Sequence, residues 1–249
     1  MNPKISIITV VFNAKNHIKD CVESVLAQDY PNYEYLLIDG ASTDGTLAIV
    51  DSYRDKLDYF VSEPDKGMYD ALNKGIAAAK GDVIGILNAD DILASLDVLS
   101  NVARQFEDEL VDALYGDLNY VSENNTQKIV RKWRDKSPNG KAMAWGWMPA
   151  HPTFYARSKF FDQYGNYRTD FGSAADYELM LRFLYTYRLN AVYLPLLMVN
   201  MRVGGMSNAT WRHRVIALLN DYKAMTLHKI PFPVLTIVLK KMRKLKQFV

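Results

Sequence analysis

The chain has 249 residues, which is long enough for one well-packed domain with an appendage. Its composition, 49% hydrophobic and 23% charged, is typical of a soluble globular protein and excludes a low-complexity or disordered chain. No apolar run reaches the ~20 residues of a membrane-spanning helix, and the strand-like start Lys4–Val10 does not resemble a signal peptide. The single cysteine, Cys21, excludes an intrachain disulfide and favours a reducing, cytoplasmic compartment.

The formal net charge of +2 is unevenly distributed along the chain. Seven of the 30 Lys and Arg residues follow Asp221, the last acidic residue, which leaves 23 basic against 28 acidic residues before them. A mildly acidic body argues against nucleic-acid binding through the main surface. The basic C-terminal region therefore needs a separate explanation.

Strand-like and helix-like segments alternate over the first 90 residues. β-Branched apolar runs indicate buried strands, and apolar residues at helical spacing indicate the helices between them. This alternation is typical of a parallel α/β sheet with right-handed crossovers. The expected strands are 4–12, 35–38, 57–61 and 83–87, and the expected helices are one capped by Asn13, one at 42–55 and one through Leu72 and Ala79.

Polar side chains follow three of these strands. Asn13 comes after the first strand, Asp39 after the second, and Asp90-Asp91 after the apolar run Val83–Leu87. Because ligands bind at the carboxyl edge of open α/β sheets, adjacent carboxylates there suit a divalent cation and a phosphate-bearing ligand, although Asp and Asn also favour turns. The motifs G-x-G-x-x-G and G-x-x-x-x-G-K-[ST] are absent, which disfavours dinucleotide-dependent dehydrogenases and P-loop NTPases.

The second half of the chain mixes helices with longer strands. The expected elements are a helix at 97–107, a strand at 113–118, a hairpin over 119–135, a helix opening at Ala175-Asp176, a strand at 191–199 and a helix at 209–228. Residues 136–149 have no regular pattern. Their aromatic and methionine side chains, Trp147 among them, either fill the core or form a wall for a flat, sugar-like ligand.

The last segment, 233–249, has the spacing of an amphipathic helix. Its apolar stripe is Val238, Met242, Leu245 and Val249, and the opposite face carries Lys240, Arg243 and Lys244. Such a helix either lies on an anionic membrane surface or packs on the protein with its basic face in solvent.

Five motifs, in this order, resemble the family 2 inverting glycosyltransferases of bacterial cell-surface polysaccharide synthesis. They are Ile7–Asn13, Leu37–Thr46, Asp65–Gly75, Leu87–Asp91 and Ala175–Arg182. The resemblance implies the GT-A fold, an α/β architecture with a mainly parallel central sheet flanked by helices and a C-terminal helical appendage. It also implies a glycosyltransferase domain at 1–210, divided into a nucleotide-binding half (1–95) and an acceptor half (96–210), followed by C-terminal helices at 211–249.

The resemblance implies a nucleotide-sugar donor, most readily a UDP-sugar, and Mn²⁺ or Mg²⁺ as cofactor. Asp91 and then Asp90 would bind the metal, although relatives often carry Asp where this chain has Asn88. Asp39 would accept a hydrogen bond from the base, or else it caps the next turn. The donor-binding residues implied are Thr9, Val11, Asn13, Asp39, Lys66 and Asp90, of which Lys66 is alternatively a solvated surface lysine.

For the reaction itself, the resemblance assigns the general base to Asp176. In an inverting transfer the acceptor hydroxyl attacks the anomeric carbon directly, so one positioned carboxylate is enough. The alternative for Asp176 is an ordinary helix N-terminal charge, and relatives often have an acidic residue where this chain has Ala175. His151, Trp147 and Glu178 would contact the acceptor, unless His151 is a structural histidine. The segment 202–207, with two glycines, resembles a flexible cover for the diphosphate.

These features together imply transfer of a hexose or N-acetylhexosamine to a saccharide acceptor. A lipid-linked acceptor and peripheral contact of the C-terminal tail with the inner face of the cell membrane would explain the basic tail. Two alternatives stay open. A nucleotidyltransferase would need a Gly-rich basic loop that residues 9–16 lack, and a non-catalytic nucleotide-sugar-binding protein would bind without metal-dependent turnover.

Overall fold

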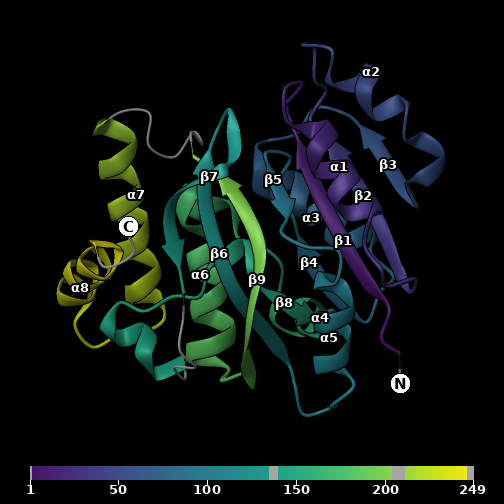
Figure 1. The fold of residues 1–249 in the computed structure, drawn as a ribbon. Coiled ribbons are helices and arrows are strands. Elements are labelled where there is room, and N and C mark those ends of the chain that lie inside the picture. Colours follow the sequence, from purple (N-terminus) through teal and green to yellow (C-terminus); the bar gives the residue numbers. More distant parts are fainter. Residues whose placement is uncertain (1, 135–139, 204–210, 246–249) are drawn as a thin grey trace.

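A nine-stranded sheet runs through the protein, seen here in a computed structural model that describes residues 2–134, 140–203 and 211–245 (Figure 1). The strand order is β3-β2-β1-β4-β8-β6-β9-β5, and β7 pairs with β6. Helices flank the sheet, and the two C-terminal helices stand on the side far from the N-terminal strands (Figure 1). The predicted α/β architecture with helices flanking a central sheet is confirmed, and the sheet is mixed, with four parallel and four antiparallel pairings among the described strands.

The N-terminal half is a parallel sheet centred on β1 (Ile5–Val11), which pairs with β2 (Tyr33–Asp39) and β4 (Val83–Ile86). All seven residues of β1 are buried, which explains why the strand does not alternate apolar and polar residues. β3 (Tyr59–Ser62) extends the sheet beside β2. The helical segments between the strands are α1 (Ile18–Leu26), α2 (Thr46–Asp51), η1 (Arg54–Lys56) and α3 (Met68–Ala78).

The second half joins the same sheet through β8 (Tyr155–Arg157), which is antiparallel to both β4 and β6 (Ala113–Ser122). β6 forms a hairpin with β7 (Asn125–Trp133) and is parallel to β9 (Ala191–Arg202). β5 (Asp91–Leu93) pairs with the end of β9. The helical segments are α4 (Val98–Phe106), η2 (Gly140–Trp145), η3 (His151–Thr153), α5 (Lys159–Tyr164), η4 (Thr169–Ala174), α6 (Ala175–Met180), the π-helical turn η5 (Leu181–Thr186), α7 (Trp211–Leu227) and α8 (Pro233–Leu245).

The apolar core consists of two clusters of buried side chains. One includes residues of α3, α6 and the 142–148 segment, and the other includes residues of α1 and α4. Trp147 belongs to the first cluster, is 5% exposed and packs edge-on against Tyr115. This is the placement expected of a core side chain. No helix in the described ranges is both long and apolar enough to cross a membrane.

Two local predictions were wrong. Asn13 does not cap a helix, because α1 begins at Ile18 and Asn13 has a positive φ of 50°. Its side chain instead serves a turn, since its Oδ1 accepts a hydrogen bond from the backbone N–H of Thr43 at 2.9 Å. The helix expected over 42–55 is interrupted, with α2 and η1 as separate pieces. The sequence did not indicate β8 because three residues are too few for a periodic pattern.

Candidate functional site

Asp39 lies at the carboxyl end of β2, where its side chain is fully buried. Its Oδ2 accepts hydrogen bonds from the Ser42 backbone N–H at 3.0 Å and from the Ser62 hydroxyl at 2.7 Å. Its Oδ1 is also buried but has no hydrogen-bond partner within the described part of the chain. One oxygen therefore holds the turn, as one of the two sequence interpretations proposed, and the other is enclosed without a hydrogen-bond partner in the described residues.

Asn13 joins the loops that follow β1 and β2. Besides the bond from Thr43, its backbone N–H donates to the Ser42 hydroxyl at 2.8 Å. Thr9 and Val11 are buried on the sheet face covered by α1, where the Thr9 hydroxyl accepts from Tyr35 at 3.1 Å. Of the three residues, the side chain of Asn13 alone lies exposed at this edge. Any contact of Thr9 or Val11 with a nucleotide would have to go through the backbone.

The two carboxylates after β4 have different surroundings. Asp91 is 0% exposed, and its Oδ2 accepts a hydrogen bond from the Asn88 amide at 3.0 Å. Burial first, and then the charge of Asp90, hold the pKa of the Asp91 carboxyl well above its usual range. Asp90 is partly exposed. This geometry favours Asp90 over Asp91 as the first ligand of a cation, the reverse of the order that we predicted.

The site fits a divalent cation by the chemistry of its donor atoms. The Oδ1 of Asp91 is buried without a hydrogen-bond partner in the described ranges, which is unfavourable unless a proton or a cation lies beside it. Asp90 and Asp91 supply the hard oxygen ligands that Mg²⁺ and Mn²⁺ prefer. The described residues contain no group of three or more His, Cys, Asp or Glu side chains arranged to hold a metal. Phosphate oxygens and water would have to complete the coordination.

Arg202, at the end of β9, fixes the position of this loop. Its guanidinium is 5% exposed, donates to the backbone carbonyl of Asp90 at 2.9 Å and pairs with Asp20 on α1. The cover that we predicted for the diphosphate continues from here, but its residues 204–207 lie outside the described residues.

Asp176 occupies the first turn of α6 and is paired with His151. The Oδ2 of Asp176 lies 3.3 Å from the Nδ1 of His151, while its Oδ1 accepts the Tyr177 backbone N–H at 2.8 Å. The side chains of Asp176 and His151 are 17% and 33% exposed, so solvent or a ligand can reach both. The structure therefore brings together two residues that we assigned to proton transfer and acceptor contact.

Tyr120 lies on β6, and its ionisation is influenced by two of the candidate carboxylates. Its pKa is raised by burial first and also by the charges of both Asp91 and Asp176, while Arg131 on β7 acts in the opposite direction. The Arg131 guanidinium lies over the Tyr120 ring at 3.7 Å. The charges of the Asp91 and Asp176 carboxylates thus act on the same phenol.

Tyr69 is a second residue of this region that the sequence did not single out. Burial, followed by the nearby Asp176 carboxylate, raises its pKa well above the usual range. Its ring lies 5.4 Å from that of Tyr167. Tyr69 belongs to the motif Asp65–Gly75, so its neighbourhood in the sequence was a usable signal, whereas Tyr120 and Arg131 lie in a hairpin without a motif.

Three other candidates lie apart from this region or are engaged elsewhere. The side chain of Glu178 is 1% exposed and pairs with Arg182 at 2.8 Å and with His228 at 3.0 Å, so it presents no free oxygen to an acceptor. Trp147 is enclosed in the core. Lys66 is exposed, and its backbone N–H donates to Asp70 at 3.1 Å. These placements favour structural roles for Glu178 and Trp147.

Known proteins with similar sequences include glycosyltransferases from mycobacteria. An uncharacterised glycosyltransferase of Mycobacterium tuberculosis is 34% identical over 188 residues, which cover 72% of this chain and 68% of the relative. A PGL/p-HBAD biosynthesis glycosyltransferase of Mycobacterium bovis is 28% identical over 211 residues, which cover 83% of this chain and 80% of the relative.

Solved structures share the fold at lower identity. The mannosyltransferase PcManGT from Pyrobaculum calidifontis, in complex with GDP-Man and Mn²⁺, has a TM-score of 0.70 and 21% identity over 97% of this chain and 70% of its own. TarS residues 1–349 of S. aureus, in complex with UDP-GlcNAc, has a TM-score of 0.66 and 18% identity over 92% of this chain and 72% of its own. This chain spans 39% of a longer TarS structure. The predicted GT-A fold is confirmed.

The family model described as glycosyl transferase family 2 matches residues 6–174. This range includes the loops after β1, β2 and β4 that carry Asn13, Asp39 and Asp90-Asp91, and it ends one residue before α6 begins. The match covers well over half of the chain and agrees with the fold and with the strand-end polar residues. The chain belongs to glycosyl transferase family 2.

Proposed function

We propose that this glycosyltransferase transfers a hexose or N-acetylhexosamine from a nucleotide sugar to a saccharide acceptor with inversion at the anomeric carbon. The observation that carries the proposal is the partly exposed Asp176, which is paired with His151. A carboxylate in this position can take the proton of an acceptor hydroxyl. No residue has to form a covalent intermediate with the sugar in such a reaction.

In the proposed reaction, the oxygen of the acceptor hydroxyl forms a bond to the anomeric carbon, and the bond from that carbon to the donor phosphate oxygen breaks. The hydroxyl proton moves to the Oδ2 of Asp176, and the nucleoside diphosphate leaves with the bond electrons. His151 keeps the Oδ2 of Asp176 oriented. The hydrogen bond from the Tyr177 backbone N–H holds the Oδ1 of Asp176 on the other side of the carboxylate. A divalent cation held by Asp90 and Asp91 would supply charge stabilisation for the leaving diphosphate.

We propose a UDP-sugar as the donor and Mn²⁺ or Mg²⁺ as the cofactor. The free Oδ1 of Asp39 supports this choice, because it can accept the N3–H of a uracil ring. Relatives of the fold differ in their nucleotides, since PcManGT is in complex with GDP-Man and TarS with UDP-GlcNAc. A donor panel therefore has to include GDP-sugars. A lipid-linked acceptor at the cytoplasmic face of a membrane, in the synthesis of a cell-surface polysaccharide, is part of the proposal.

The test is a donor panel of UDP- and GDP-sugars with Mn²⁺, Mg²⁺ or a chelator, in which release of the nucleoside diphosphate is measured. We expect turnover with one UDP-sugar and loss of turnover with the chelator. The variant Asp176→Asn should bind UDP like the native chain and lose at least ~100-fold in turnover, because it removes the base alone. Retained turnover in this variant contradicts the role of Asp176. If the native chain binds nucleotide sugars but turns over none of them, the non-catalytic alternative is favoured.

A further inference from the structure

The C-terminal helix α8 packs on the protein through its polar face. Thr236 and Arg243 donate hydrogen bonds to backbone carbonyls in η2 at 2.7 and 3.1 Å. Lys240 pairs with Asp221 at 2.9 Å, and its ammonium lies 3.5 Å from the centre of the Tyr177 ring. Thr236 and the half-buried Lys240 therefore face the body, while Arg243 and Lys244 keep exposed side chains. The helix packs on the body, which was one of the two predicted alternatives, and three of its basic side chains, Lys241, Arg243 and Lys244, are exposed.

The apolar side of α8 consequently faces solvent, and α7 presents a second apolar stripe. Four exposed apolar residues of α7 recur at spacings of four, four and three, which places them on one side of the helix, and Ile216 and Leu227 are exposed on other sides. We call the following set the α7–α8 apolar face: Trp211, Val215, Leu219 and Tyr222 on α7, Phe232 in the connection, and Val234, Leu235, Val238 and Met242 on α8, with exposed fractions from 44% to 71%.

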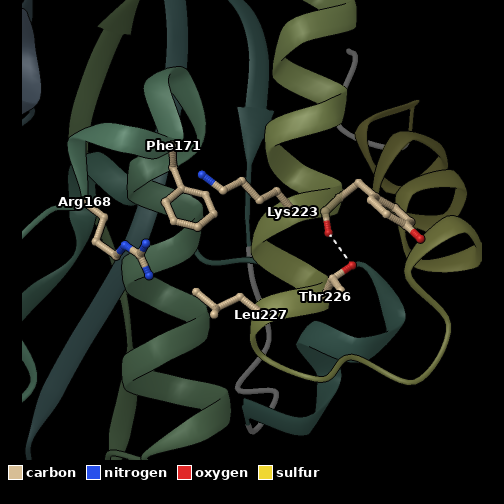
Figure 2. A pocket seen from close by; sticks show the side chains of 6 residues that line it. Arg168, Phe171, Lys223, Thr226 and Leu227 are labelled. Carbon is tan, nitrogen blue, oxygen red and sulfur yellow. Dashed lines mark hydrogen bonds between the residues drawn. The ribbon is translucent and has the colours of Figure 1, made fainter.

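A different side of α7 is anchored to the body (Figure 2). Lys223 forms an ion pair with Asp170 at 3.0 Å and lies 4.3 Å from the centre of the Phe171 ring. Ala224 and Met225 are fully buried. Figure 2 shows Phe171 and Lys223 pointing toward each other across a hollow between η4 and α7. Because these contacts fix the rotation of α7 about its axis, they also fix the outward direction of its stripe.

The charge around this face points to one kind of partner. No acidic residue follows Asp221 in the sequence, whereas Lys229, after α7, and Lys241, beside the apolar stripe of α8, are exposed. A second copy of the chain would bring like charges together, which opposes self-association. An anionic bilayer offers an apolar layer and negative headgroups at once, and tryptophan and tyrosine favour that boundary.

We propose that the α7–α8 apolar face binds the surface of an anionic phospholipid bilayer, with both helices lying in the plane of the membrane. Exposed apolar patches of this extent mark interaction sites in otherwise water-soluble folds. The inference deepens the proposed membrane location and rests on it, but not on the identity of the sugar or the nucleotide. It also replaces the basic tail as the membrane contact by a surface that two helices share.

The test measures co-sedimentation of the full chain with vesicles of phosphatidylcholine alone and with added phosphatidylglycerol. We expect binding that requires phosphatidylglycerol and weakens in high salt. The triple variant Leu219→Ser, Val238→Ser and Met242→Ser should lose at least about 10-fold in partitioning, because three apolar side chains no longer enter the bilayer. A matched control, Leu96→Ser with Leu110→Ser, changes leucines that are 63% and 75% exposed far from this face and should bind like the native chain.

Vesicle binding by the triple variant at the native level overturns the proposal, as does a native chain that ignores phosphatidylglycerol. A native dimer that the triple variant dissociates, seen by light scattering, would assign the face to a second copy instead. UDP binding of the triple variant should stay unchanged. Loss of UDP binding in the native chain would instead count against the proposed function, so the two failures are distinguishable.

Discussion

Two neighbouring carboxylates can share a motif and differ in what they can reach. The side chain of Asp91 is enclosed because β5 pairs with the end of β9, and Asn88 holds one of its oxygens. Asp90 keeps an exposed surface, while its backbone carbonyl is fixed by Arg202. The sequence predicted the pair from local pattern, but it could not predict which member is buried. That depends on a strand pairing between segments far apart in the chain.

Exchange of Asp90 for Asn should therefore weaken Mn²⁺-dependent UDP binding more than Asp91→Asn does. Without metal, Asp91→Asn should be at least as stable as the native chain at neutral pH. The raised pKa of Asp91 means that its ionised form is disfavoured in the folded state, so ionisation costs stability as the pH rises above the usual carboxyl range. Calorimetric titration of UDP with and without Mn²⁺ measures the first effect, and thermal unfolding the second. A larger loss of metal-dependent affinity for Asp91→Asn would restore the order predicted from the sequence.

Helix α6 links the proposed base, Asp176, to the C-terminal helices. Two residues after Asp176, the buried Glu178 pairs with Arg182 and with His228, and the other ring nitrogen of His228 lies 2.8 Å from the Thr186 hydroxyl. The Arg182 guanidinium also donates to the backbone carbonyls of residues 164–166. We expected the acidic residue at 178 to face an acceptor. Sequence spacing places it one turn from Arg182, but could not show that the chain after α7 returns to cover it.

Loss of the Glu178 charge should destabilise the protein without touching the donor. The variant Glu178→Gln leaves the Arg182 guanidinium buried without its counter-ion, which costs about 3–5 kcal/mol and lowers Tm by roughly 6–20 °C in a chain of this size. We expect KM for the donor to stay constant while kcat falls through displacement of α6. The matched control is Asp170→Asn, which removes two ion pairs, with Arg168 and with Lys223, at a carboxylate that is 50% exposed, and should cost less than about 2 kcal/mol in all. Equal effects of both changes would contradict a special role for the buried pair.

At the scale of the whole molecule, the sequence predicted the N-terminal half better than the way the halves join. The alternation of buried strands and amphipathic helices predicted β1 to β4, because parallel strands and the helices that connect them have strong local sequence patterns. The junction is β8, three residues long, and it lies between β4 and β6. Its signal is in side-chain packing instead: a Cβ atom on Gly85 would lie 2.1 Å from the ring of Tyr155. Gly85, in the middle of a buried strand, is therefore the sequence feature that indicates this contact.

This contact gives a test of whether the two halves form one cooperative unit. Gly85→Ala forces the buried Tyr155 ring out of place, and such overpacking costs about 1–3 kcal/mol. Tyr155→Leu removes the ring, so the alanine should then cost less, with a coupling of roughly 0.5–3 kcal/mol between the two positions. Urea unfolding followed by circular dichroism and by tryptophan fluorescence measures both quantities. We expect the two signals to change together in every variant, because β8 hydrogen-bonds to β4 and β6 alike. An unchanged cost of Gly85→Ala in the Tyr155→Leu background would contradict the contact between the two residues. Two separate transitions in the native chain would show that the halves are stable independently of this junction.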